Sequence, residues 1–116
     1  MLRLTNTPEL VRAIAGHDAV VVLYGGAHCG VCMALKPKLH RVLCEQYPDI
    51  RAYYVDCGQY PAVAAQAGVF SLPVVRVYLA GQLCLEKARV FSVSQLMADL
   101  SRPYALMRNG LGQRPG

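Results

Sequence analysis

The sequence predicts an α/β domain with a central mixed β-sheet and helices on both faces. Residues 19–24 form a continuous apolar, β-branched run, as expected of a strand buried on both faces of a sheet. Strand-like runs alternate along the chain with segments whose apolar residues recur at helical spacing. Residues 74–79 and 82–88 are both strand-like and are separated by the turn Ala80-Gly81, which predicts a hairpin.

The chain opens with a predicted edge strand over residues 2–5. Thr7 is the predicted N-cap of a short helix, because a proline at the first helical position and an early acid, Pro8 and Glu9, follow it. This helix is expected to stop at Gly16, before the buried strand.

A long helix is predicted from Gly30 to about Tyr47, where Pro48 ends it. Pro37 inside this helix removes one backbone hydrogen bond and is expected to bend it. The apolar positions that recur at helical spacing are Val31, Leu35, Leu39, Val42 and Leu43.

The second half of the chain predicts the remaining elements. Residues 51–56 read as a strand, and residues 61–67 as a short helix closed by Gly68. Ser92 followed by Gln95 is a capping box that opens a last helix, predicted to run through Leu100.

The predicted domain spans residues 1–103. After Pro103 the composition changes, and the chain ends in RNGLGQRPG. We therefore expect residues 104–116 to form a flexible C-terminal tail.

Composition excludes several classes of protein. The chain of 116 residues is long enough to bury a core without disulfide staples, and its apolar runs are far shorter than the roughly 18 residues of a membrane span. No signal peptide is recognisable at the N-terminus, so we expect a cytoplasmic protein. The net charge of +5 comes from scattered basic residues, which favours acidic protein partners over nucleic acid. We expect a monomer.

The chemistry of the sequence is concentrated in Cys29 and Cys32. The predicted strand, glycine-rich turn and helix place Cys29 at a helix N-terminus, where free N–H groups and the helix dipole stabilise a thiolate. Cys32 follows about one turn later, close enough for a disulfide. Cys29 is therefore the candidate nucleophile and Cys32 the candidate resolving thiol. No acidic residue lies between Asp18 and Glu45, but the basic residue Lys36 does. The local charge therefore favours a thiolate.

Residues 2–101 resemble the thioredoxin family. The resemblance rests on C-G-V-C after a buried strand, Pro37 five residues past the second cysteine, the Leu72-Pro73 dipeptide, and Gly81 eight residues beyond Pro73. It implies a thioredoxin fold and a Cys29/Cys32 dithiol that acts on protein disulfides without an organic cofactor. A thioredoxin reductase with NADPH behind it is the implied electron source.

The resemblance also implies a substrate groove. In the family the proline that matches Pro73 is cis and packs beside the dithiol, so Leu72 and Pro73 are expected to line the groove together with Gly30 and Val31.

Three positions depart from the family pattern. This chain has no tryptophan before the first cysteine and no proline between the two, because His28 and Val31 stand there. A more oxidising reduction potential is expected from Val31. The family's buried aspartate, six residues before the first cysteine, is Leu23, which predicts slower resolution by Cys32.

His28 and Asp56 are candidates for tuning the dithiol. An imidazole beside Cys29 can stabilise a thiolate or carry protons, although an exposed polar residue without a role is the alternative. Asp56 resembles a family aspartate near the active site, and we expect it to orient His28.

The other three cysteines carry separate expectations. Cys44 is expected to be a buried structural thiol and Cys84 a core residue. Cys57, at the end of its strand, is a candidate third redox thiol. A zinc or iron–sulfur site at the dithiol is the chemical alternative, but zinc needs four ligands and no second such pair is present. No metal is therefore expected.

The leading hypothesis is a thiol–disulfide oxidoreductase acting on protein disulfides. The alternative is a non-catalytic adaptor or redox sensor that keeps the fold. The absence of the buried acid and of the tryptophan favours the adaptor, whereas retention of both cysteines favours the enzyme.

Overall fold

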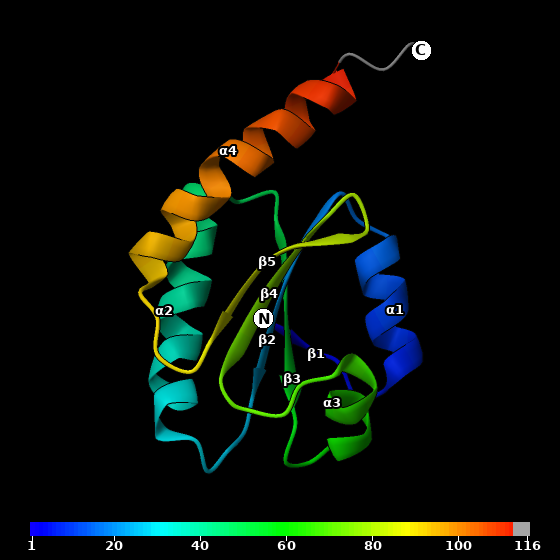
Figure 1. Cartoon of the computed structure of the whole chain (residues 1–116), viewed down its shortest axis with the longest axis vertical. Helices are drawn as coiled ribbons and strands as arrows, with labels where there is room; N and C mark the ends of the chain where they lie inside the picture. The colour runs from blue at the N-terminus through cyan, green and yellow to red at the C-terminus, as the bar shows by residue number, and fades with distance from the viewer. Residues whose placement is uncertain (113–116) are drawn as a thin grey trace.

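Five strands form one mixed sheet at the centre of the protein, in the order β1-β3-β2-β4-β5 (Figure 1). The structure is a computed structural model that describes the backbone of residues 1–112 and the side chains of residues 1–110. The strands are β1 (Leu2–Arg3), β2 (Ala19–Gly25), β3 (Arg51–Asp56), β4 (Val74–Leu79) and β5 (Gln82–Ala88).

Four helices cover the sheet. Helices α2 and α4 pack on one face, and α1 and α3 on the other, which confirms the predicted α/β class (Figure 1). Their bounds are α1 (Thr7–Ala15), α2 (Gly30–Gln46), α3 (Pro61–Ala67) and α4 (Val93–Gly112).

The central strand β2 organises the sheet. It runs parallel to β3 and antiparallel to β4, and all seven of its residues are buried. The β-branched run predicted this burial, because such side chains fit a pleated surface that is covered on both sides.

Alternate residues of β2 enter two separate cores. Leu23 packs into the core under α2 and α4, and Val22 into the core under α1 and α3. Leu39 of α2 and Leu100 of α4 are fully buried in the first core, and Val63 of α3 lies in the second. The sheet therefore holds both helical layers, and β2 links them.

The start of α1 differs from the prediction. Asn6, rather than Thr7, is the N-cap, and its side-chain oxygen accepts the Glu9 N–H at 2.8 Å. The Glu9 side chain in turn binds the residue before the N-cap, because its carboxylate accepts the Thr5 N–H at 3.0 Å. Asparagine is at least as good an N-cap as threonine, so the helix starts one residue earlier than the sequence pattern suggests.

The end of α4 corrects the expected tail. The helix does not stop at Leu100 but continues to Gly112, with Pro103 inside it. The Tyr104 ring packs edge-on against Tyr47, the C-cap of α2, with the centroids 5.2 Å apart, and Met107 contacts the same core. This tertiary contact keeps the chain helical beyond Pro103, where the change in composition predicted a tail. Residues 113–116 of that predicted tail lie outside the described part of the chain.

Within residues 1–112, no helix combines the length and the apolar character that crossing a membrane would require.

Candidate active site

The two cysteines lie at the junction of β2 and α2. The chain leaves β2 at Gly25 and turns so that the Cys29 N–H donates to the Gly26 carbonyl at 3.1 Å. Cys29 is the N-cap of α2, and its Sγ accepts the Cys32 N–H at 3.2 Å. The predicted position of Cys29 at the helix N-terminus is therefore confirmed. A negative charge on this sulfur is stabilised there by the helix dipole and by the N–H donor.

Cys29 and Cys32 form a disulfide, with their Cα atoms 5.2 Å apart. Their exposure differs, because Cys29 is half-buried whereas Cys32 is only 2% exposed. A sulfur that approaches from solvent therefore meets Cys29 first.

Gly25 allows the backbone of β2 to approach Cys32. A Cβ at this position would lie 3.1 Å from the Cys32 Cβ, 3.3 Å from its Sγ and 3.1 Å from the Tyr54 ring. Real Cβ contacts are rarely this tight, so a larger residue would require Cys32 or the Tyr54 ring to shift by a few tenths of an ångström. The sequence interpretation did not single out this glycine.

The Leu72–Pro73 peptide bond is cis, as the resemblance implied. A Cβ on Gly26 would lie 3.5 Å from the Leu72 side chain, which places Leu72 beside the turn that carries the dithiol. The Pro73 carbonyl accepts the Arg89 N–H at 2.7 Å. The cis-proline loop therefore lies between the dithiol turn and the segment that follows β5.

Gly30 and Val31, the other two predicted groove residues, are exposed at the start of α2. Val31 is 54% exposed, so this position of the helical pattern faces solvent rather than the core. An exposed valine between the cysteines offers an apolar contact to a bound chain.

Asp56 and His28 do not form the expected contact in the part of the chain that the structure describes. Asp56 Oδ1 instead accepts the N–H groups of Gly58 and Gln59, both at 3.0 Å. His28 is exposed and has no side-chain hydrogen bond in this part of the chain. The carboxylate thus stabilises the turn after β3 rather than orienting the imidazole.

Leu23 is fully buried on the α2 side of the sheet. A leucine side chain has no carboxylate, so this position cannot accept a proton near Cys32. A positive charge does lie near the two cysteines. Lys36 Nζ is 4.1 Å from the centre of the Tyr54 ring, and this ring borders Gly25, which contacts Cys32. Lys36 places a cation on the first turns of the helix that carries both cysteines, which favours a thiolate.

Cys57 has a raised thiol pKa. Burial, followed by the nearby Asp56 carboxylate, raises the pKa of Cys57 to about 11. The thiolate is the reactive form, so this cysteine is a poor nucleophile near neutral pH. The structure thus disfavours Cys57 as a third redox thiol.

Cys44 and Cys84 are exposed, so their predicted burial is wrong. The buried positions of α2 are Cys32, Leu35, Leu39 and Leu43. Cys44 lies one residue beyond the last of them, on a different side of the helix. Its Sγ lies 3.9 Å from His40 Nε2, a neighbour one turn earlier.

Cys84 lies on β5, one of the two edge strands of the sheet, most of whose residues are exposed. Its apolar neighbour Leu83 is 52% exposed. Apolar neighbours in sequence do not imply burial on a strand that has a partner on one side only.

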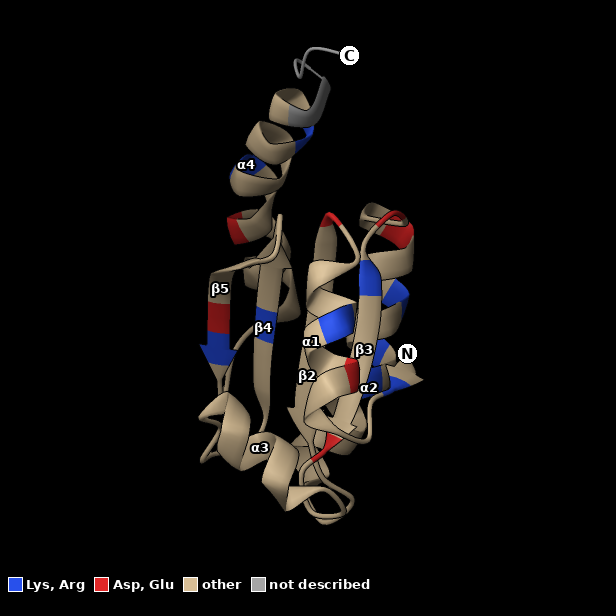
Figure 2. Cartoon of the chain, turned by 90° about the vertical axis from the view of Figure 1, so that its right-hand side faces the viewer, with Lys and Arg blue, Asp and Glu red and all other residues tan. Residues whose placement is uncertain are grey.

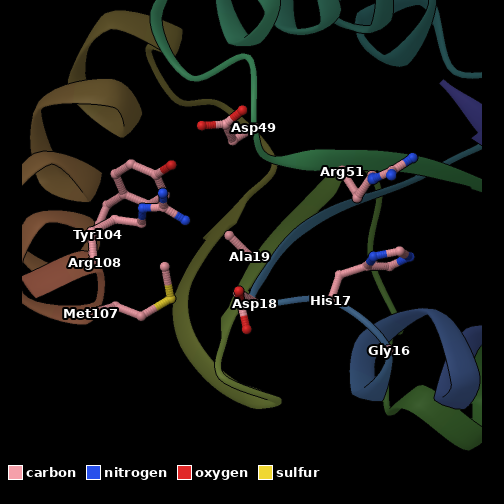
Figure 3. Close-up of a pocket in the computed structure, with 9 residues that line it drawn as sticks. All are labelled: Gly16, His17, Asp18, Ala19, Asp49, Arg51, Tyr104, Met107 and Arg108. Carbon is pink, nitrogen blue, oxygen red and sulfur yellow. The ribbon is translucent and has the colours of Figure 1, made fainter. Parts of the chain in front are cut away.

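A cavity of about 220 Å³ lies at the opposite end of the sheet, where β2 begins. In Figure 3, Tyr104 and Arg108 of α4 lie across this cavity from His17 and Arg51. None of the predicted site residues lines it. Within the described residues, no group of three or more His, Cys, Asp or Glu side chains could hold a metal ion.

Known proteins match this chain over most of its length. The family model Thioredoxin matches residues 3–101. Thioredoxin-like protein YdfQ of Bacillus subtilis is 33% identical over 106 residues, covering 91% of this chain and 94% of that protein. The chloroplastic Thioredoxin-like 3-2 of Arabidopsis thaliana is 36% identical over 66 residues, 56% of this chain, and the match spans only 34% of the length of that protein.

A solved structure has the same fold. Mitochondrial thioredoxin 3 of Saccharomyces cerevisiae in its oxidised form superimposes with a TM-score of 0.76 at 24% identity, over 88% of this chain and 94% of that one. The match of the family model, the similarity to YdfQ and the Cys29–Cys32 disulfide lead to one conclusion. The chain belongs to the thioredoxin family of thiol–disulfide oxidoreductases.

Proposed function

We propose that the protein reduces or exchanges disulfides in protein substrates, with Cys29 as the nucleophile and Cys32 as the resolving thiol. The observation that carries this proposal is the disulfide itself, in which Cys29 is accessible and caps α2 while Cys32 is 2% exposed. Only an accessible sulfur can attack a large partner, and a buried one is protected from competing thiols.

The reaction consists of two exchanges. In the reduced protein, the Cys29 thiolate attacks one sulfur of the substrate disulfide, forming a mixed disulfide and releasing the other substrate sulfur as a thiolate. Cys32 then loses its proton and attacks Cys29 Sγ. This step forms the Cys29–Cys32 disulfide and releases the second substrate thiolate. Two electrons pass to the substrate; because Cys29 attacks as a thiolate, Cys32 supplies one of the two protons and water the other, and no organic cofactor takes part.

Because Leu23 supplies no carboxylate, the Cys32 proton leaves to water or to the departing substrate thiolate. We expect this second step to be the slower one. His28 is exposed beside Cys29, where it can exchange protons with solvent during the first step.

The substrate chain is expected to lie against Val31, Leu72 and Pro73. Leu72 is partly exposed beside the dithiol turn, and Val31 is exposed between the two cysteines. The Val31 and Leu72 side chains would contact the residues that flank the substrate cysteine, whereas Pro73 is buried and would shape the groove from beneath.

A reductase is needed to return the protein to its dithiol form. We propose a thioredoxin reductase that draws on NADPH, in keeping with the family, and a cytoplasmic setting in which the protein acts as a monomer.

Insulin reduction in the presence of dithiothreitol tests the function. The wild type is expected to accelerate precipitation of the insulin chains, and Cys29→Ser to remove the acceleration. Cys44→Ser is the matched control, because it removes an exposed thiol from the same helix and should keep the wild-type rate. Equal rates for Cys29→Ser and the wild type would refute the enzyme and favour a non-catalytic adaptor.

Equilibration of the pair with glutathione then measures the direction of electron flow. A strongly reducing potential would indicate a reductant of the thioredoxin kind, and a mild one would indicate an exchange or isomerase role.

A further inference from the structure

Arg89 adopts a backbone conformation that arginine rarely takes. Its φ is 65°, and the only other described non-glycine residue with a positive φ is Ala80. Ala80 lies beside Gly81 in the β4–β5 hairpin, where a turn of this kind requires positive φ at both positions. Arg89 lies outside the hairpin, in the bend that directly follows β5, and the Cβ of an arginine makes this conformation costly there.

The Arg89 backbone is held at the dithiol end of the molecule. Its N–H donates to the Pro73 carbonyl at 2.7 Å. This contact comes one residue after the point where Ala88 of β5 pairs with Val74 of β4. Non-glycine residues in this region cost free energy, and they persist where the surrounding structure holds them, often at functional sites. The chain thus keeps a strained arginine next to the cis-proline.

The charge of Arg89 is not neutralised within the described residues. The neighbouring cations on the same hairpin are paired, because Arg76 binds Glu86 and Lys87 binds Asp99. Figure 2 shows the charged residues of β4 and β5 beside each other, and α3 without any. No acidic residue occurs from residue 57 to residue 85, the stretch that includes α3 and the cis-proline loop.

Two strongly exposed apolar side chains lie close in sequence to Arg89 and to Pro73, its hydrogen-bond partner. Val90, the next residue, is 89% exposed, and Phe70, three residues before Pro73, is 88% exposed. Large apolar side chains with so little protein contact offer a surface to a partner. An unpaired cation next to such a surface selects for a partner that brings an anion.

We propose that Arg89 is a specificity-determining residue that binds an acidic side chain of the substrate, close in sequence to the cysteine under attack. The partner is an extended polypeptide in which apolar and acidic residues flank the disulfide. This proposal rests on the proposed function. The guanidinium supplies a fork of N–H donors that matches a carboxylate, and the apolar residues contact the substrate without selecting for charge.

Paired peptides test this directly. Each peptide carries one internal disulfide and a fluorescence readout of its opening, and the pair differs only in Glu or Gln two residues from a cysteine. The reduced wild type is expected to open the Glu peptide about two- to tenfold faster in kcat/KM, since an exposed charge-assisted contact contributes about that much. The preference should shrink as salt is raised, because exposed charges are screened.

Variants assign the preference to one residue. Arg89→Gln should bring the Glu/Gln ratio close to one, Arg89→Lys should retain part of it, and Arg89→Glu should invert it. Arg108→Gln is the matched control, because it removes the same charge at the cavity on the opposite end of the sheet. It should keep the wild-type ratio.

The outcomes separate the two proposals. A wild type that opens both peptides equally, or an Arg89→Gln variant with the wild-type ratio, would overturn the role of Arg89 and leave the enzyme intact. Equal loss of the preference in Arg108→Gln would assign it to the overall charge and would also overturn that role. A wild type that opens neither peptide would refute the proposed function together with this inference.

Discussion

At the residue scale, the strain at Arg89 predicts a gain in stability when it is removed. Arg89→Gly should raise the free energy of unfolding by about 1 kcal/mol, because glycine accepts positive φ without a steric cost. Urea denaturation measures this change. Ala80→Gly is the control. It introduces glycine at the only other described non-glycine residue that has a positive φ.

The two variants should differ in function. Arg89→Gly should lose the preference for the Glu peptide, and Ala80→Gly should keep it. A lower stability for Arg89→Gly would contradict the strain at this position.

The raised pKa of Cys57 predicts a separate order of thiol reactivity. At pH 8 iodoacetamide should modify the exposed Cys44 and Cys84 before Cys57, as followed by peptide mass spectrometry. The Cys57 rate should keep rising toward pH 11, because burial and Asp56 hold the pKa of its thiol near that value. Asp56→Asn should lower this pKa, since it removes the nearby negative charge. Modification of Cys57 as fast as Cys44 at pH 8 would rule out the raised pKa.

The sign of the linked stability change follows from the same pKa. The ordinary Cys57 pKa of 9.0 applies to the unfolded chain, and folding raises it to about 11. Between these values the unfolded chain binds fewer protons, so the contribution of this thiol to stability is complete below pH 9 and is lost as the pH rises toward 11.

At the scale of single elements, the N-terminus of α2 depends on the nucleophile itself. Cys29 Sγ caps the helix by accepting the Cys32 N–H. In reducing buffer, Cys29→Ala should lower the free energy of unfolding by about 0.5–2 kcal/mol, whereas Cys29→Ser should keep most of it, because a hydroxyl is a good N-cap.

Both variants at Cys29 should be inactive in insulin reduction. Chemical denaturation against the reduced wild type measures the difference between them. Equal stability of the two variants would show that the capping contact contributes nothing.

The second half of α4 owes its stability to packing. Tyr104→Ala should lower the free energy of unfolding by about 1–3 kcal/mol, because it removes an edge-on contact with Tyr47 and leaves space beside the core. Leu106→Ala is the control on the same helix. The Leu106 side chain is 60% exposed, so its loss should change stability by less than about 0.5 kcal/mol.

Insulin reduction should be unaffected by Tyr104→Ala under stabilising conditions. Tyr104 lines the cavity at the end of the sheet opposite to the dithiol. A loss of activity that stability does not explain would indicate coupling between the two ends.

At the scale of the whole molecule, β2 joins the two cores. Val22 and Leu23 are both fully buried, but they face opposite helical layers. Because the two layers share this strand, Val22→Ala and Leu23→Ala should each lower the midpoint of one cooperative transition. Near-ultraviolet and far-ultraviolet circular dichroism should give coincident curves in both variants. Separate transitions for the two probes would mean that the layers unfold independently.

Much of the architecture follows from local signals. The β-branched run predicted β2, Gly68 at φ 72° closes α3 as its sequence suggested, and the Ala80-Gly81 turn connects β4 to β5. These features depend on backbone conformations that a few neighbouring residues determine. The positions of Cys29 and Cys32 at the start of α2 were predictable for the same reason.

Apart from the N-cap of α1, which neighbouring residues decide, the errors share one physical cause, because each concerns contacts between residues far apart in sequence. Cys44 and Cys84 have apolar neighbours, yet nothing in the fold covers them. The composition changes after Pro103 and the chain ends in RNGLGQRPG, which suggested a tail, but Tyr104 and Met107 reach the core. Helical and strand periodicity indicates which residues share a face, but it does not indicate what packs on that face.

The sequence by itself determined the order of the elements and the dithiol at a helix N-terminus, since both depend on local patterns of residues. Only the tertiary structure decided that the backbone at Gly25 approaches Cys32 closely, and that the Arg89 N–H binds the Pro73 carbonyl. These two contacts join residues 7 and 16 positions apart in the chain. Their existence depends on how the turns and strands of the sheet pack together, which no local pattern encodes.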